Sequence, residues 1–319
     1  MAEIIPVCKD MQLAYSANSE YITYSVESLG EVLFTGRSYK RPNDSKCYFK
    51  LNEIAENYLH NTFDPEGAPI QKGIGSVRRF DLIIDGKRDK NYWFYNNWDY
   101  TFENIKTQQV KVLSRPINNK VSKSGKIVIS VINTYESNYE LPIELFINNE
   151  WVTARTETLH SNSIYHLLLD ASEFSNGSKV RVLGEVYELV DDCIEYQLIY
   201  SNKSGGFDVI NLNGRTQIED KFEALYHSKS VLNTTAQHEK SKWLNGVKRV
   251  FTGNIFWLNK RQAERVEHLF SSTMVWLYDI KMDKMIPVVI DDSSVDYKKN
   301  NKLMAFQIKL SESHSKIVK

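Results

Sequence analysis

Short runs of β-branched and aromatic residues recur along this 319-residue chain, and polar turn segments separate them at close intervals. In residues 21–28, Ile22, Tyr24 and Val26 alternate with polar residues, which is the period-2 pattern of a half-buried strand. Similar runs fill the middle third of the chain without long helical patterns between them. Closely spaced short strands are typical of sandwiches and barrels, so the pattern predicts a mostly β fold.

Turn residues between these runs predict where the chain reverses. Leu29-Gly30 and Asp85-Gly86 each separate two strand-like runs, and Asp-Gly readily adopts the positive φ angles of a tight hairpin turn. Asn148-Asn149 has the character of another hairpin tip. Gly205-Gly206 fits a turn or bulge that needs positive φ, with a strand on either side of it.

Two segments have helical periodicity instead. The first, residues 51–61, places on one helical face Leu51, Ile54, Ala55, Tyr58 and Leu59. Asn52 is the expected cap of that helix, because its short side chain can accept a hydrogen bond from an unpaired backbone N–H. The second segment follows Asn259 and carries an apolar stripe formed by Ala263, Val266, Leu269 and Phe270.

Together these elements predict a multi-domain chain of β-sandwich-like or barrel-like modules with a C-terminal α+β unit. We expect a β-rich N-terminal domain with one short helix at residues 1–109. A β-sandwich-like middle domain should cover residues 110–190, and an α+β domain, with one helix on an antiparallel sheet, residues 191–319.

The charges are balanced, because lysine plus arginine and aspartate plus glutamate both number 40. A balanced chain gives no general reason to expect nucleic acid or an anionic membrane as a partner. The basic pairs Arg78-Arg79 and Lys298-Lys299 lie beside acidic residues and are interpreted as solvated faces. No apolar run approaches the roughly 20 residues that a membrane-spanning helix needs. We therefore expect neither membrane insertion nor specific nucleic-acid binding.

The cysteines Cys8, Cys47 and Cys193 are odd in number and far apart, and no CxxC pair occurs. This pattern favours three unpaired thiols in a reducing compartment over a disulfide framework or a zinc site. The first residues, MAEIIPVCKD, lack the basic and apolar regions of a secretory signal. The sequence therefore predicts a soluble protein made in a cytoplasm.

No motif in the sequence predicts catalysis, a cofactor or a metal. None of the seven histidines lies three or four residues from another, and no GxSxG element presents a serine. The acidic pairs Asp191-Asp192 and Asp291-Asp292 lack the glycine of a calcium loop and are interpreted as solvated turns. His166 lies in a strand-like run, where a core role is expected. We expect a protein without enzymatic activity.

One aromatic cluster stands out as a candidate interface, and it consists of Tyr92, Trp93, Phe94, Tyr95, Trp98 and Tyr100. Neighbouring strand residues point to opposite faces, so Trp93 and Tyr95 share one face and Tyr92 and Phe94 the other. Aromatic residues on both faces imply burial on both sides. Three interpretations stay open: an internal core, a surface between subunits, or a platform on which sugars stack.

Three segments together resemble a known family. They are GEVLFTGRSYKRPND followed by LNEIAENYL, the stretch CIEYQLIYSNKSGGFDVINLNG, and the C-terminal WLNKRQAERVEHLFSSTMVWLYD. The pattern is similar to structural tail and connector proteins of tailed bacteriophages that infect Bacteroidetes, the crAss-like group. The resemblance covers most of the chain except the middle domain.

The resemblance implies a virion structural protein without catalysis, a ring-type subunit of a phage tail or connector. Its partners would be copies of itself in a symmetric ring and other tail, portal or connector proteins. It would be made in the cytoplasm of the host bacterium and would end up in the virion tail. The alternative is a tail-tip protein that binds a receptor or carbohydrate, which requires the aromatic cluster to be exposed and planar.

Overall fold

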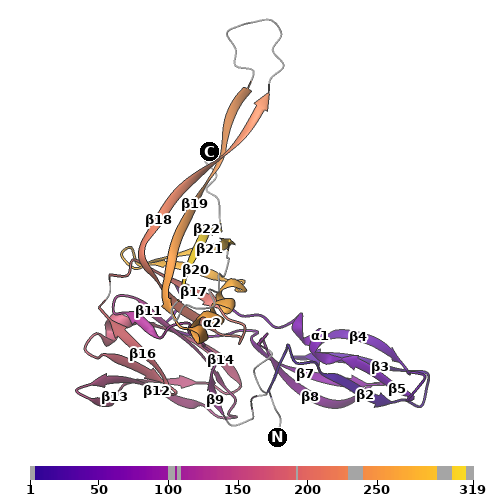
Figure 1. Ribbon diagram of the computed structural model, residues 1–319. Coiled ribbons are helices and arrows are strands. Elements are labelled where there is room, and N and C mark those ends of the chain that lie inside the picture. The colour runs from indigo at the N-terminus through magenta and orange to yellow at the C-terminus, as the bar shows by residue number, and fades with distance from the viewer. Residues whose placement is uncertain are drawn as a thin grey trace, which may run out of the picture. The chain divides into compact units, whose positions relative to one another are not determined.

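The computed structural model describes residues 4–99, 105, 109–191, 193–228, 240–292 and 304–313. The described chain is mostly β, with several sheets, a closed barrel and a C-terminal helix, which confirms the fold class expected from the sequence (Figure 1). It divides into two compact units. The N-terminal unit comprises residues 1–190 and 201–208, and the C-terminal unit comprises residues 191–200 and 209–319.

The N-terminal unit begins with a five-stranded sheet in the order β1-β8-β7-β3-β4. Its strands are β1 (Ile4–Pro6), β8 (Lys87–Tyr95), β7 (Val77–Ile84), β3 (Tyr21–Ser28) and β4 (Glu31–Tyr39). β1 runs parallel to β8, and the remaining neighbours are antiparallel. The predicted hairpin turns are present: φ is positive at Leu29, Gly30, Asp85 and Gly86.

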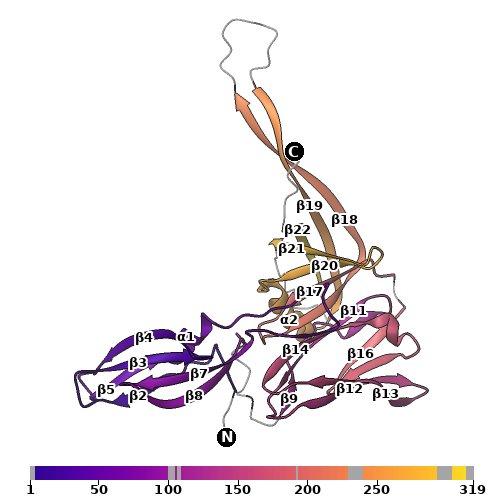
Figure 2. The same cartoon turned by 180° about the vertical axis from the view of Figure 1, so that it is seen from behind.

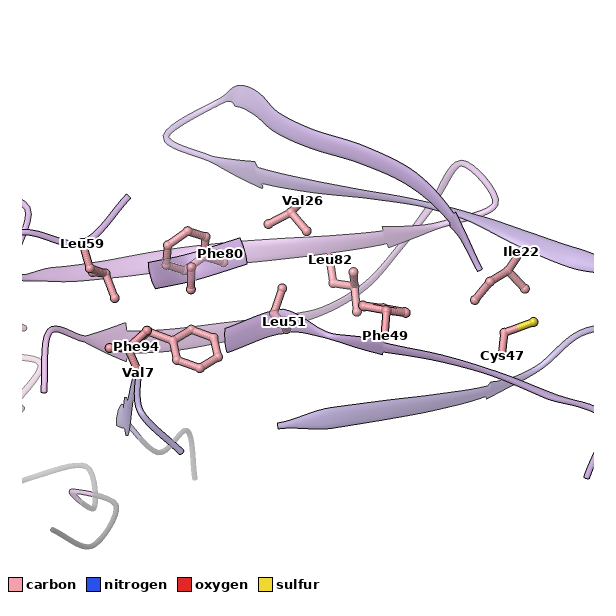
Figure 3. Packing of buried hydrophobic residues seen from close by; sticks show 11 residues of the cluster. Val7, Ile22, Val26, Cys47, Phe49, Leu51, Leu59, Phe80, Leu82 and Phe94 are labelled. Carbon is pink, nitrogen blue, oxygen red and sulfur yellow. The ribbon is translucent and has the colours of Figure 1, made fainter. Parts of the chain in front are cut away.

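A smaller layer covers one face of this sheet. It contains β2 (Gln12–Ser16), β5 (Lys46–Lys50) and the short helix α1 (Leu51–Glu56). Figure 3 shows the core between them, in which Phe49 and Leu51 belong to the same buried cluster as Phe80 and Leu82 of the sheet. Sheet and helix therefore share one apolar interior.

The helix at residues 51–61 is shorter than predicted, and the expected role of Asn52 as its cap is wrong. α1 ends at Glu56, and Lys50 occupies the N-cap position without a side-chain hydrogen bond. Asn52 is buried inside the first turn, where its Oδ1 accepts from the Met11 N–H at 3.2 Å and its Nδ2 donates to Val7 O at 3.4 Å. Its amide thus ties the chain segment around β2 to the helix.

The second half of the N-terminal unit is a sandwich of two sheets (Figure 2). One sheet has the order β10-β16-β15-β12-β13, with β10 (Lys120–Ser122), β16 (Glu185–Val190), β15 (Lys179–Val182), β12 (Tyr139–Ile147) and β13 (Glu150–Leu159). The other has the order β6-β14-β11-β9, with β6 (Ile70–Lys72), β14 (Ser163–Asp170), β11 (Lys126–Asn133) and β9 (Val110–Val112). A 3₁₀ helix, η1 (Ala171–Phe174), follows β14.

The two central strands of the second sheet are buried on both faces. Six consecutive side chains of β11, from Ile127 to Ile132, are no more than 1 % exposed, and nearly all of β14 is buried. The predicted tip at Asn148-Asn149 joins β12 to β13, and both residues have positive φ. A strand buried on both faces reads as a continuous apolar run, which matches the sequence KIVISVI.

β6 shows how closely the halves of the N-terminal unit are interleaved. It comes from residues before position 109, yet it pairs with β14 of the sandwich sheet. The proposed division into domains 1–109, 110–190 and 191–319 stays a prediction.

The C-terminal unit is a closed barrel with the strand order β17-β18-β19-β22-β21-β20. Its strands are β17 (Tyr196–Ser201), β18 (Phe207–Ser228), β19 (Lys240–Leu258), β20 (Val275–Asp279), β21 (Lys284–Asp292) and β22 (Met304–Glu312). Helix α2 (Lys260–Phe270) follows β19 and buries Ala263, Val266 and Leu269. Asn259 caps it with a reciprocal capping box, in which Asn259 Oδ1 accepts from the Gln262 N–H at 3.0 Å.

Two barrel strands are much longer than the others. β18 and β19 remain paired from Asp220 and Arg249 to Ser228 and Lys240, whereas β22 pairs with β19 only from Val250 onward. Figure 1 shows these strands continuing beyond the barrel as a twisted two-stranded ribbon. We call residues 220–228 and 240–249 the ribbon. This extension was not predicted from the sequence.

No helix in the described ranges is both long and apolar enough to cross a membrane. All three cysteines are free thiols, as predicted, with Cys8 and Cys47 buried and Cys193 exposed. The predicted solvated basic pair Lys298-Lys299 lies outside the described residues.

Candidate functional site

The aromatic cluster singled out in the sequence occupies the end of β8, and its residues alternate between two interiors. Phe94 is fully buried in the core of Figure 3, and Tyr92 packs against that core. Tyr95 is fully buried in a second core with Ile4, and Trp93 packs against this one. Each side chain therefore follows the strand alternation.

The cluster does not form a planar surface. Phe94 and Tyr95 are 0 % exposed and Trp93 is half-buried, whereas Trp98 is 40 % exposed. Trp98 Nε1 donates to Asn96 Oδ1 at 3.0 Å. Tyr100 lies outside the described residues. The exposed platform that a sugar-binding role for this cluster requires is absent from the described part, and an intersubunit contact through Trp98 stays a prediction.

The chain after β8 is held by residues from far along the sequence. The side-chain amide of Asn97 donates to the Tyr95 hydroxyl at 3.0 Å and to Ser204 O at 3.1 Å. The Trp98 N–H donates to Lys203 O at 2.6 Å, and Ser204 Oγ donates to Asp99 Oδ2 at 3.2 Å. Residues 201–208, which comprise the link between β17 and β18 and the strand ends that flank it, belong to the N-terminal unit. We call them the connecting loop.

Both glycines of the connecting loop are needed, but for different reasons. Gly205 has a φ of +85°, and a Cβ built there would lie 1.9 Å from Asn96 O. Gly206 does not have positive φ, so the expectation of positive φ at both glycines is wrong for Gly206. Its Cβ would lie 2.7 Å from the Ser130 Cβ and 3.2 Å from the Leu113 Cβ. Close packing, not backbone conformation, is the reason for a glycine at 206.

A buried polar network fixes the other end of the connecting loop. Ser130 Oγ accepts from the Phe207 N–H at 2.8 Å and lies 2.8 Å from His166 Nδ1. The Phe207 ring packs edge-on against His166 at 4.8 Å between centroids. His166 is a core histidine, as expected from its strand.

Asp208 and Asn202 complete this network. Asp208 accepts from the Arg115 N–H at 2.7 Å and from Asn202 Nδ2 at 2.8 Å. Asn202 Oδ1 accepts from the Gly206 N–H at 3.0 Å. Buried polar groups are stable only when they are paired, so these bonds specify one conformation of the connecting loop.

The two central side chains of this network are shielded from solvent. His166 and Ser130 are both 0 % exposed, and burial lowers the pKa of His166 to about 3, so the imidazole is neutral at pH 7. Its Nε2 has no hydrogen-bond partner among the described atoms. Across the described residues, no three His, Cys, Asp or Glu side chains gather as a metal site.

Exposed strand edges form the second kind of candidate site. β4 is the last strand of its sheet and exposes Val32 by 57 %, Phe34 by 40 % and Tyr39 by 60 %. An edge strand presents unpaired backbone N–H and C=O groups, which can pair with another chain. β13, at the edge of the sandwich, exposes Val152 by 51 %.

The ribbon has two such edges, because no described strand pairs with its outer sides. At its base, Arg249 Nε and Nη2 donate to the two carboxylate oxygens of Asp220 at 2.7 and 3.0 Å. This bidentate pair fixes the register where the ribbon leaves the barrel.

No protein-family model and no curated protein matches this chain. Sequence reasoning missed the connecting-loop network and the ribbon. Gly205-Gly206 was the only sequence signal near the network, whereas the ribbon carries a short alternation of Phe222, Ala224 and Tyr226 with Glu223 and His227 that was not interpreted as a strand.

Proposed function

We propose that the chain is a structural subunit of a closed homo-oligomer, and that this oligomer is part of a bacteriophage tail or connector. The ribbon is the observation that carries the assembly part of the proposal. The resemblance of three segments to crAss-like phage proteins supports the tail or connector role.

The ribbon needs a partner to be stable. A two-stranded hairpin on its own is marginally stable in water, because neither face is covered and both edges lack partners. Nothing within the described chain pairs with these edges. A neighbouring subunit can supply both the missing strand and a covering surface. The ribbon is therefore best explained as an arm that pairs with the next copy.

The geometry of such a contact determines the assembly. An arm that binds a different surface on its neighbour makes a head-to-tail interface, and a head-to-tail interface that closes by rotation produces a ring. The net charge of zero removes long-range repulsion between copies.

The proposal is tested by shortening the ribbon. In the test variant, Asn-Gly replaces residues 221–248, so that the Asp220–Arg249 pair closes directly into a tight turn. The matched control places Asn-Gly between Ser228 and Lys240 and leaves the whole ribbon in place. We expect the control to keep the molar mass of the wild-type oligomer in light scattering and the test variant to be monomeric.

Circular dichroism and thermal unfolding test whether both variants are folded, and we expect both to be. A test variant that is folded and still has the oligomer mass contradicts the role of the ribbon. The tail assignment is tested separately by labelling purified virions with antibody against the chain. Absence of the chain from virions contradicts the phage role and leaves the assembly role standing.

A further inference from the structure

A groove of about 420 Å³ lies on the solvent face of the N-terminal sheet, opposite the core of Figure 3. Thr23 and Ser25 of β3, Thr35 and Arg37 of β4, and Ile83 of β7 line it. These residues share one face, because the sheet register pairs Thr23 with Arg37 and Ser25 with both Thr35 and Ile83. The volume is in the range of small-molecule sites.

Two residues that face the core contribute mainly backbone to the floor of the groove. These residues are Gly36 and Tyr24. The Tyr24 side chain points to the core, and a Cβ on Gly36 would point the same way, since it would lie 2.8 Å from the Tyr24 ring. The β7–β8 turn forms one wall through Gly86. Asp85 in the same turn accepts from the Thr23 N–H at 2.8 Å and from Thr23 Oγ1 at 2.9 Å, which holds this wall against β3.

The polar groups in the groove are available to a ligand. In the part of the chain that the structure describes, the Ser25 and Thr35 hydroxyls make no side-chain hydrogen bond, and Arg37 has no carboxylate within ion-pair distance. The guanidinium carbon of Arg37 lies 5.0 Å from the Tyr21 ring centroid. This cation–π contact orients the guanidinium in advance, which lowers the entropy lost when it binds an anion.

An aromatic surface continues the groove. The Tyr21 and Tyr39 rings lie 5.6 Å apart across the two strands, and Tyr39 is 60 % exposed. The ring C–H groups of a pyranose can pack on such a tyrosine face while its hydroxyls bond to serine and threonine. One cation is too few for a nucleic acid, whose binding requires several phosphate contacts. Ile83 is the single aliphatic lining residue, which argues against an apolar ligand.

We propose that this groove binds an acidic saccharide. The sugar carboxylate would pair with Arg37, its hydroxyls would bond to Thr23, Ser25 and Thr35, and its ring would pack on Tyr39. The inference does not rest on the ring assembly, since the lining residues belong to one sheet of a single chain and to the β7–β8 turn of that sheet.

The test is calorimetric titration of the full chain with two acidic probes, 3′-sialyllactose and trigalacturonate. Lactose and methyl-esterified trigalacturonate are their neutral counterparts. We expect at least one acidic probe to bind at least tenfold more tightly than its counterpart. Arg37→Met should weaken that binding at least tenfold, because it removes the charge and keeps a long side chain.

Arg41→Met is the matched control. Arg41 is also exposed and also stacks on a tyrosine, with its guanidinium carbon 4.2 Å from the Tyr48 ring centroid, but it does not line the groove. The Arg41→Met variant should bind the acidic probe with wild-type affinity, and Arg37→Met and Arg41→Met should unfold at the same temperature. The proposal is overturned if neither acidic probe binds, or if Arg37→Met and Arg41→Met have the same affinity.

Discussion

Replacing Gly205 with alanine should break the attachment of the connecting loop. The added Cβ would lie 1.9 Å from Asn96 O, a backbone atom that can move only with the chain between β8 and Asp99. The same substitution places an alanine at a φ of +85°. Gly205→Ala therefore combines backbone strain with a steric clash.

The two effects can be separated with a matched control. Gly184 has a φ of +88° in the same unit, and a Cβ there would meet nothing within 4 Å. Gly184→Ala should therefore lower the free energy of unfolding by the conformational term alone, about 1 kcal/mol. In Gly205→Ala, movement of Asn96 also breaks the bonds from Trp98 to Lys203 and from Asn97 to Ser204. At about 1 kcal/mol per hydrogen bond, the total becomes about 3 kcal/mol.

Urea unfolding of both variants measures this difference, and hydrogen exchange of residues 92–99 and 201–208 locates it. We expect the larger loss of stability in Gly205→Ala, with faster exchange in both segments. Equal unfolding midpoints for the two variants would refute the argument that the contact with Asn96 O requires a glycine.

Three further results are expected. The pKa of His166 is about 3, below its ordinary value of 6.5, so between these pH values the unfolded chain binds one more proton than the folded chain. The free energy of unfolding should therefore fall as pH drops from 6.5 toward 3, by up to about 1.4 kcal/mol per pH unit. His166→Gln should reduce that slope in acid unfolding curves. Asn259→Ala should lower the free energy of unfolding of the C-terminal unit by about 1 kcal/mol in urea titrations, because it removes the cap of α2. In thiol labelling of the folded chain, Cys193 should react quickly and Cys8 and Cys47 only after unfolding, and a Cys193→Ser variant that keeps the fast phase would contradict the burial.

The hairpins were predictable because a two-residue turn is a local signal. Asp85-Gly86 and Asn148-Asn149 have positive φ as their chemistry suggested. The apolar run of β11 and the apolar stripe of α2 were also predictable from the sequence, because the buried positions of these elements carry apolar side chains.

The ribbon was not predicted because its apolar alternation is short: Phe222, Ala224 and Tyr226 alternate with Glu223 and His227, but Leu225 interrupts the pattern. Ile218, at the start of the extension, is 50 % exposed, and residues such as Glu219 and Asp220 are charged and exposed. Backbone pairing to β19 holds these residues in a strand.

The connecting-loop network depends on long-range partners that no local pattern encodes. Ser204 and Asp99 are 105 residues apart, and Phe207 and Ser130 are 77 apart. The two carboxylates, serines and asparagines in this network resemble ordinary loop residues until the fold brings them together. The prediction that Asn52 caps α1 was wrong for the same reason, since its hydrogen-bond partners Met11 and Val7 lie 41 and 45 residues away in the sequence.

The central claim is that copies of this chain close into a ring. Negative-stain electron microscopy of the purified full chain tests it most directly. We predict class averages with a single rotational symmetry and a central opening, built from several 37.0 kDa chains. Uniform particles of one 37.0 kDa chain, at micromolar concentration and without symmetry, would contradict it.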